Sequence, residues 1–567
     1  MGKRGRFICG GVATAIGILG ALLIAAGLVV VLKVMPDQIK DGIKKDKQLI
    51  KYKNGTYNDY TKDWVSPKYI QRMQYWVYDY KNPISIINRG QLPDVDEKGP
   101  YTYVEDTFND ITWMSDDNTI LNYTQTIRYR FDPEQSCLGC DPYKDTVLVP
   151  DISFILALEQ FGECYSFFGS FNLSHLCDLP AVQGFYDNDL VPLLADAMDL
   201  FDTGPFVRVT IDQLLISGYE PKVYVSFLQN VLNIVIDVFN ILLHDIINPL
   251  QHAHIEPPQN VSYGQTLFYT SPHYIVTTGK DNYKEVGFIK SFTMEDPFNK
   301  NITLSTTGTT LPEQWWSKCN GDTLNSMKAR TVAGNTGDFY PSFLEKKDVV
   351  PIYVDSICRS ILMKYQKEVT YEGIDAYRFV LPADEFNWDQ PENCGFCFPL
   401  KHDYFDRNQG DHSYPNGIMD LRGCQEGNPV AISKPHFYEA SDVVKNFIPR
   451  FKSSDDDNVW MDVEPQSGTI LMAHKRMQIN LMANQFKNIS SMKVFMPGAY
   501  PIYWLNESFY ADQGTVRDLK NDLINPQKLF KIICYSAVGL GGLLILISIL
   551  SCFGIVFVSR RQSSKID

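Results

Sequence analysis

Two long apolar segments near the ends of the 567-residue chain restrict its fold more than any other feature. Residues 8–32 and 532–558 contain no charged side chain, and each exceeds the roughly 20 apolar residues that a helix needs to cross a bilayer. We interpret both as transmembrane helices. The first segment follows three basic residues, as a signal peptide would, but its apolar run exceeds the roughly 7–15 residues of a cleaved signal. An uncleaved anchor is therefore expected rather than cleavage near Ala25.

Glycosylation triplets predict the topology. Asn-x-Ser/Thr acceptors are used only on the lumenal side, and all seven in this chain lie between the two apolar segments. The predicted glycosylation sites are Asn54, Asn122, Asn172, Asn260, Asn301, Asn488 and Asn506. Both tails, residues 1–7 and 559–567, are therefore expected in the cytosol, with residues 33–531 forming an extracellular or lumenal domain.

The charge and size of this domain limit its function. The chain has a formal net charge of −14 at pH 7, and nearly all acidic residues lie within 33–531. Such a domain repels the phosphate backbone of nucleic acid, which is not expected as a partner. Because roughly 500 residues exceed the usual single-core limit of about 250–300, we expect one composite domain or closely fused subdomains.

Nine of the twelve cysteines lie in residues 33–531. In an oxidising compartment the default interpretation is disulfides with one thiol left over. The Cys-x-x-Cys pairs at 137–140 and 394–397 leave two alternatives open: a shared zinc site, and a thioredoxin-type redox pair at 394–397. Zinc-protease, serine-hydrolase, phosphate-loop and EF-hand motifs are missing from the sequence. We therefore assign no catalytic residue, metal or cofactor.

Residues 223–247 form a third apolar stretch, interrupted by polar residues at intervals of three and four. These polar positions are Ser226, Gln229, Asn230, Asn233, Asp237, Asn240, His244 and Asp245. A third span would place the first three triplets on the opposite side of the membrane from the other four, so we reject it. The stretch is predicted to be an amphipathic helix of the lumenal domain. Its apolar face packs in the core or forms a lipid entrance or partner groove.

Seven stretches in one order along the chain resemble the class B scavenger receptor family. This family includes fatty acid translocase, the high-density lipoprotein receptor, the lysosomal integral membrane protein and insect sensory neuron membrane proteins. The stretches are 82–103 (NPISIINRGQLPDVDEKGPYTY), 355–361 (DSICRSI), 377–382 (YRFVLP), 393–397 (NCGFC), 433–437 (SKPHF), 462–471 (DVEPQSGTIL) and 500–508 (YPIYWLNES).

The resemblance implies an α+β fold. Its features are a lumenal antiparallel β-barrel-like core, an apical helical bundle at residues 151–250, and an internal hydrophobic tunnel, between two transmembrane helices. Alternating apolar and polar residues at 119–131 and 377–382 independently predict strands.

The resemblance also implies disulfides between Cys319 and Cys394 and between Cys358 and Cys424. The match breaks at Cys397, because the sequence has no cysteine between it and Cys424. Cys397 is therefore the candidate for the leftover thiol. Additional local disulfides are expected between Cys137 and Cys140 and between Cys164 and Cys177.

The function implied by the resemblance is that of a receptor, not an enzyme, that binds lipids (fatty acids, sterols or phospholipids) or lipoprotein-like particles. It passes hydrophobic cargo to the membrane through the tunnel, which needs apolar walls and a polar group for the lipid head group. The tunnel residues cannot be assigned from the sequence. Alternatives are an endosomal or lysosomal sorting receptor that binds a protein at its apex, and a thiol redox enzyme using 394–397.

Several members of the family carry lysines in the apical region. In this chain, residues 145–207 contain ten acidic residues and no Lys or Arg. The negative charge either favours cationic protein partners or belongs to a solvated face that binds no partner. The C-terminal tail contains no dileucine or tyrosine sorting signal, which favours the plasma membrane over the endosome or lysosome.

The membrane segments carry two further predictions. Small residues at Ala13, Gly17, Ala21 and Ala25 form a stripe suited to close contact between the two spans, or between two protomers of a homo-oligomer. Cys9 and Cys552 lie near the cytosolic ends of the spans and are candidates for palmitoylation.

Overall fold

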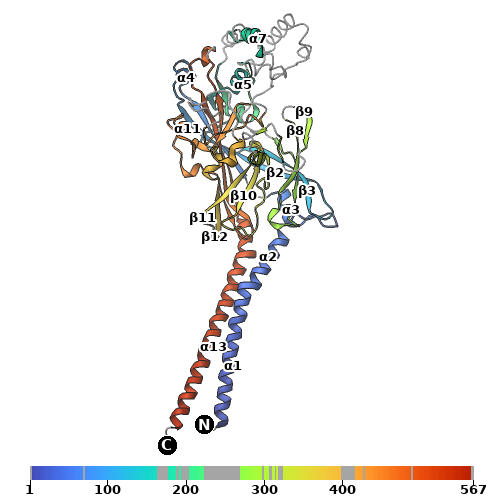
Figure 1. The fold of residues 1–567 in the computed structure, drawn as a ribbon, viewed down its shortest axis with the longest axis vertical. Coiled ribbons are helices and arrows are strands. Elements are labelled where there is room, and N and C mark those ends of the chain that lie inside the picture. The colour runs from blue at the N-terminus through green and yellow to red at the C-terminus, as the bar shows by residue number, and fades with distance from the viewer. Residues whose placement is uncertain are drawn as a thin grey trace. The chain divides into compact units, whose positions relative to one another are not determined.

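The computed structural model shows two compact units, which are described separately (Figure 1). One comprises residues 1–48, 370–375 and 511–567, and the other comprises residues 49–369 and 376–510. The structure describes residues 3–67, 71–161, 177–186, 191–192, 204–221, 268–296, 299–305, 310–312, 315–316, 323–396, 415–425, 428–486 and 489–563. The predicted helix at 223–247 and most of the predicted apical bundle lie outside these residues.

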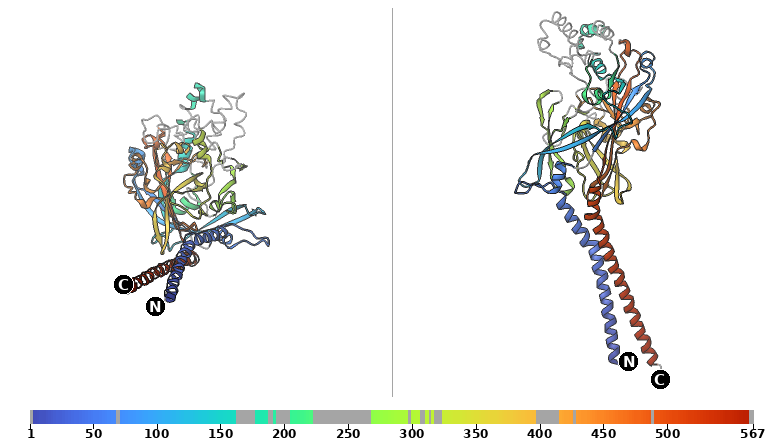
Figure 2. Two further views of the ribbon diagram at one scale, coloured as in Figure 1. Left: turned by 60° about the horizontal axis from the view of Figure 1, so that its bottom comes forward. Right: turned by 180° about the vertical axis from the view of Figure 1, so that it is seen from behind.

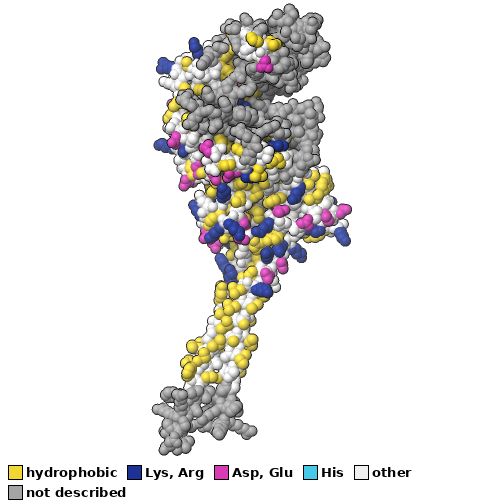
Figure 3. Space-filling model, in the orientation of Figure 1, with side chains coloured by type: hydrophobic (Ala, Val, Ile, Leu, Met, Phe, Trp, Pro, Cys, Tyr) yellow, Lys and Arg dark blue, Asp and Glu magenta, His cyan; other side chains and the backbone are white. Residues whose placement is uncertain are grey.

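The first unit is built on two long helical stretches, which lie side by side (Figure 2). The N-terminal stretch joins α1 (Lys3–Val29), η1 (Val30–Val34) and α2 (Met35–Asp46), and the C-terminal stretch joins α12 (Gln513–Leu519), η16 (Lys520–Ile524) and α13 (Asn525–Ser563). Both are long and apolar enough to cross a membrane. On the face shown in Figure 3, hydrophobic side chains are frequent along this pair, and charged side chains gather at its upper end. Each helical stretch continues past the domain boundaries expected at residues 33 and 531, into polar sequence.

Small residues allow α1 and α13 to touch, and two of the four predicted stripe positions, Ala13 and Gly17, lie in this contact. A Cβ atom on Gly20 would lie 2.5 Å from the carbonyl oxygen of Gly541, and Ser548 donates to the carbonyl oxygen of Ala13. Ala21 and Ala25 instead face outward. A four-residue step turns a helix by roughly 40° more than one full turn, so a stripe at that spacing drifts off the contact face.

The second unit contains a sheet of 15 antiparallel strands (Figure 1). The order along its main path is β10 (Val349–Val354), β11 (Arg359–Tyr371), β12 (Ile374–Val380), β15 (Trp460–Glu464), β16 (Thr469–Ala483), β17 (Gly498–Tyr510), β1 (Gln71–Tyr80), β2 (Val95–Met114), β3 (Ile120–Phe131), β7 (His273–Thr277), β8 (Ile289–Asp296) and β9 (Asn299–Ser305). Three short strands join this path at its sides: β6 (Phe268–Thr270), β13 (Met419–Asp420) and β14 (Val430–Ser433). A separate ladder pairs β4 (Thr146–Pro150) with β5 (Phe206–Thr210).

Short helices decorate this unit. They are α3 (Asp59–Val65), α4 (Pro83–Arg89), α5 (Ile152–Phe161), α7 (Pro180–Phe185), α10 (Thr323–Arg330) and α11 (Asp442–Lys445). Two hydrophobic cores share the one sheet, as suits a domain of this size. The predicted fold class, α+β with a large antiparallel sheet and two terminal helices, is confirmed. The strands expected at 119–131 and 377–382 are β3 and β12.

Candidate functional site

Four adjacent strands, β16, β17, β1 and β2, bring together polar side chains from distant parts of the sequence. The register places Gln71 of β1 opposite Glu105 of β2, and Lys475 of β16 opposite Glu507 of β17. Because side chains alternate between the two faces of a strand, these four residues share one face of the sheet. We call Gln71, Glu105, Lys475 and Glu507 the interior polar cluster.

Hydrogen bonds join three members of the interior polar cluster. The Nζ atom of Lys475 lies 2.5 Å from Oε1 of Glu507, and the amide of Gln71 donates to the same oxygen. Glu105 is buried, with only 4% of its surface exposed. The side chain of Lys475 keeps 42% of its surface accessible. The cluster therefore combines a deeply buried carboxyl group with a lysine side chain that keeps part of its surface accessible.

Burial and charge shift the pKa values of the cluster. Burial, reinforced by the neighbouring Glu507, raises the pKa of Glu105 from 4.5 to about 8. Burial opposes the charge of Lys475, but Glu507 outweighs it and raises the pKa of that ammonium group. Glu105 thus keeps its proton in the folded chain at pH values where the unfolded chain has lost it. Folding stability therefore falls as pH rises from 4.5 towards 8, which makes Glu105 a candidate functional residue.

Tyrosine rings surround the interior polar cluster on the same face of the sheet. The ring centroid of Tyr75 lies 5.9 Å from that of Tyr103 and 5.5 Å from that of Tyr503, both in edge-on contact. Tyr129 stands opposite Glu105 on β3 and hydrogen-bonds its carboxyl group. Burial raises the pKa of all four tyrosines, so they stay neutral. A few charged groups set among aromatic rings form the kind of lining that binds amphipathic molecules.

A second carboxyl group, which is partly buried, lies close to Lys475. Asp338 accepts hydrogen bonds from the indole of Trp64, at 3.2 Å, and from the amide of Gln125, at 3.4 Å. Burial raises the pKa of Asp338, and Lys475 partly offsets that effect. A Cβ atom added to Gly337 would lie 4.0 Å from the Nζ atom of Lys475. The face therefore holds three carboxyl groups for one ammonium group.

A recess of about 60 Å³ opens beside strand β2. It is lined by Pro67, Glu105, Asp106, Thr107 and Phe108. This volume holds a few water molecules but no lipid chain. The tunnel implied by the resemblance stays a prediction.

Comparison with known proteins decides the family. The family model described as "CD36 family" matches residues 18–552, which is nearly the whole chain. The chain belongs to the CD36 family. A relative described only as an uncharacterized protein of Caenorhabditis elegans is 38% identical, covering 96% of both chains.

Two named relatives are more distant. Lysosome membrane protein 2 of Homo sapiens is 24% identical over 92% of this chain and 90% of the relative. Scavenger receptor class B member 1 of Rattus norvegicus is 24% identical over 95% of this chain and 89% of the relative. CD36 family members are receptors rather than enzymes. With its two terminal helices, this CD36 family member is a membrane protein.

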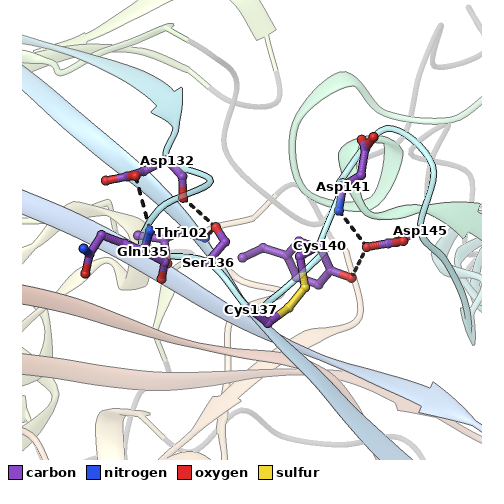
Figure 4. The surroundings of a disulfide bond; sticks show 9 residues. Thr102, Asp132, Gln135, Ser136, Cys137, Cys140, Asp141 and Asp145 are labelled. Carbon is purple, nitrogen blue, oxygen red and sulfur yellow. Dashed lines mark hydrogen bonds between the residues drawn. A yellow bond between two sulfur atoms is a disulfide. The ribbon is translucent and has the colours of Figure 1, made fainter.

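Several cysteines of this CD36 family member form disulfide bonds in the structure. Cys358 is bonded to Cys424, and Cys137 to Cys140 in a short turn beside Asp141 and Asp145 (Figure 4). Cys177 and Cys394 are also disulfide-bonded. Their expected partners Cys164 and Cys319, and the expected free thiol Cys397, lie outside the described residues. The bond between Cys137 and Cys140 leaves neither sulfur for the alternative zinc site. Cys552 is a free, exposed thiol, whereas the side chain of Cys9 lies outside the described part of the chain.

The glycosylation triplets occupy different environments. Asn54 is exposed, and its Oδ1 accepts from the N–H and hydroxyl of Thr56. Asn122 and Asn506 are buried in strands, and the amide of Asn506 donates to Gln74 at 3.0 Å. The structure therefore argues against glycans at Asn122 and Asn506. Asn301 lies in β9 with its side chain outside the described part, and Asn172, Asn260 and Asn488 lie outside it entirely.

We expect peptide mapping after enzymatic deglycosylation to show conversion of Asn54 to Asp and no conversion of Asn506. A glycan on Asn506 would have to displace the hydrogen bond to Gln74 and leave the sheet. The exposed triplet at Asn54 serves as the internal control. Detection of a modified Asn506 in the folded protein would contradict this expectation.

Several apical acidic residues serve the fold rather than a partner. Asp151 is buried and accepts from the N–H groups at the start of α5 and from the hydroxyl of Tyr219. Glu159 pairs with Arg422 at 2.7 Å, and Asp145 accepts from Tyr101. These three carboxylates are already satisfied within the chain, which weakens the case for a cationic partner at the apex.

Sequence reasoning missed the interior polar cluster. Glu507 is the middle residue of the triplet that begins at Asn506, and that triplet was interpreted only as a glycosylation site. A signal was nevertheless available. Glu105 and Asp106, and Lys475 and Arg476, are adjacent charged pairs in strand-forming stretches, so the alternation of a strand turns one member of each pair towards the core face. Charged residues in such runs predict a buried polar site, although not its composition.

Proposed function

We propose that this CD36 family member is a plasma-membrane receptor that binds lipids or lipid-bearing particles. It passes their hydrophobic cargo to the bilayer through the interior of the large sheet, with both tails in the cytosol. The interior polar cluster carries the proposal. A partly accessible lysine paired with Glu507 and a buried carboxyl group, surrounded by tyrosine rings, suit the head group of an amphipathic lipid whose chain needs apolar surroundings.

An endosomal or lysosomal location with a protein ligand is the second candidate. Similarity to Lysosome membrane protein 2 favours it, whereas similarity to Scavenger receptor class B member 1 does not discriminate between the membranes. The engaged apical carboxylates weaken a protein-binding apex. Steady-state imaging of the tagged chain separates the two candidates, because surface staining supports the plasma membrane and overlap with lysosomal markers supports the alternative.

The lipid-transfer proposal is tested on the full-length chain in nanodiscs. Mass spectrometry of extracted lipids is expected to find bound lipid, and fluorescent lipid should move from donor particles to acceptor vesicles. Met477 shares the interior face with Lys475 and pairs with Leu505. The substitution Met477→Trp adds bulk to this face, which typically costs about 1–3 kcal/mol. If a lipid chain meets the same obstruction, its transfer should fall by roughly fivefold or more.

The matched control is Leu362→Trp, at an exposed position of β11. This variant should transfer lipid at the wild-type rate. Thermal unfolding of both variants shows whether Met477→Trp is still folded at the temperature of the assay. Unchanged transfer in Met477→Trp, or an absence of bound lipid in the wild type, would refute a conduit through the sheet.

A further inference from the structure

An outer surface of the large unit combines exposed aliphatic side chains with basic ones. Helix α4 packs against η15 (Ser490–Met492), and Figure 3 shows hydrophobic and basic side chains close together at the upper left, where Figure 1 places α4. Four apolar side chains of this surface are between 39% and 72% exposed, and two basic side chains are also exposed. We call this surface the α4 patch, and it consists of Ile84, Arg89, Leu92, Lys493, Val494 and Met496.

Close backbone contact holds the two halves of the α4 patch together. A Cβ atom on Gly90 would lie 2.5 Å from the carbonyl oxygen of Val494, so only glycine allows this approach. The neighbouring side chains of Ile86, Met492 and Phe495 are buried in one of the two hydrophobic cores. The exposed aliphatic side chains are therefore carried on a rigid support without being part of that core.

The α4 patch is positively charged, although the whole chain has a formal net charge of −14. No Asp or Glu occurs within four residues of Arg89 or of Lys493 in the sequence. Neither basic residue forms an ion pair with any residue that the structure describes. The next carboxylates along the chain, Asp94 and Asp96, lie 2.7 Å and 3.5 Å from the guanidinium group of Arg450. This patch therefore attracts an anionic partner.

The composition of the α4 patch favours a lipid surface over a protein. Protein interfaces are enriched in Trp, Tyr and Arg and depleted in Lys, and their strongest contacts are usually aromatic or Arg anchors. The apolar residues of the α4 patch are Ile, Leu, Val and Met, and one of its two cations is a lysine. Aliphatic side chains beside basic ones suit the boundary between the head groups and acyl chains of an anionic lipid layer.

We propose that the α4 patch docks the chain onto the anionic phospholipid surface of an incoming lipid-bearing particle. Its aliphatic side chains enter the head-group layer, and Arg89 and Lys493 bind the negatively charged head groups. This inference rests on the proposed function, because it assigns the surface at which that particle is captured. It places capture outside residues 145–207, where ten acidic residues would repel an anionic particle.

The test uses the full-length chain in phosphatidylcholine nanodiscs, immobilised on a sensor over which vesicles flow. The vesicles contain phosphatidylcholine with about 30% phosphatidylserine, which supplies an anionic surface. We expect binding to weaken about tenfold for vesicles of phosphatidylcholine alone, and to weaken as added salt screens the basic residues. Ile84→Asp and Lys493→Glu should each weaken binding of the anionic vesicles about tenfold.

Matched controls lie elsewhere on the same unit. Leu324 is the second residue of α10 and 69% exposed, as Ile84 is the second residue of α4 and 72% exposed. Lys367 is an exposed lysine of β11. Leu324→Asp and Lys367→Glu should bind anionic vesicles as the wild type does. Thermal unfolding compares all four variants, and Lys493→Gln, which only removes the charge, should still weaken binding about fivefold if Lys493→Glu is unstable.

The outcomes separate docking from the proposed function. Unchanged vesicle binding in Ile84→Asp and in the Lys493 variants, equal binding of neutral vesicles, or equal losses in the control variants would overturn docking at the α4 patch. Each of these results would leave bound lipid and its transfer intact. A wild-type chain that neither holds nor transfers lipid would refute the proposed function, whereas selective loss of vesicle binding in the patch variants would still support docking at this surface.

Discussion

Replacement of Arg359 by alanine is expected to lower the free energy of unfolding by about 3–5 kcal/mol, because it leaves a buried carboxylate without its partner. Arg359 is 2% exposed and Glu385 is 6% exposed, and Nη2 of the arginine lies 2.6 Å from Oε1 of the glutamate. The guanidinium carbon lies 3.6 Å from the ring centroid of Phe396, a contact that is also lost.

The pH dependence gives this prediction a signature. Burial already raises the pKa of Glu385, and Arg359 opposes that effect. Without the arginine, the pKa of Glu385 in the folded chain rises further above its unfolded value. The variant should therefore lose stability, relative to the wild type, as pH rises from about 5 to 8.

The control is a second ion pair, which comes from the same strand as Arg359 and the same turn as Glu385. Lys364 of β11 pairs with Asp384, next to Glu385, but both side chains are about half exposed. Lys364→Ala should cost less than about 1 kcal/mol. Thermal and denaturant unfolding of the solubilised full-length chain compares the variants. Equal losses for the buried and exposed pairs would contradict the argument, and the double variant Arg359→Met, Glu385→Leu should recover most of the stability.

Removal of the disulfide between Cys358 and Cys424 is the second large effect. The two cysteines are separated by 66 residues, and closing such a loop restricts the unfolded chain by about 4 kcal/mol. Both cysteines are buried in one of the two hydrophobic cores that share the large sheet. The double variant Cys358→Ser, Cys424→Ser should therefore fold poorly and show a strongly reduced yield of folded protein.

The short disulfide provides the comparison. Cys137 and Cys140 are separated by three residues, so their bond is expected to stabilise the chain by only about 2 kcal/mol. The double variant Cys137→Ser, Cys140→Ser should give a yield of folded protein much closer to the wild type. Unfolding curves and the yield of folded full-length protein measure both effects. A larger defect from loss of the short disulfide would show that loop length does not govern stability here.

Local sequence patterns determined much of the architecture. Two uncharged apolar runs identified the terminal helices, and alternating residues identified β3 and β12, because periodicity is a property of neighbouring residues. The small-residue stripe meets the other span at Ala13 and Gly17 and turns outward at Ala21 and Ala25, because four residues exceed one helical turn. Burial of the sequon at Asn506 was also hidden, since an exposed and a buried triplet have the same letters.

The sequence by itself determined that the chain is anchored by two membrane helices and carries a large β-rich domain of the CD36 family. Only the tertiary structure decided that Gln71, Glu105, Lys475 and Glu507 meet on one face of the sheet. Alternation shows which residues of one strand share a face, but the pairing of strands hundreds of residues apart depends on the packing of the whole sheet. The candidate site is therefore a product of strand register.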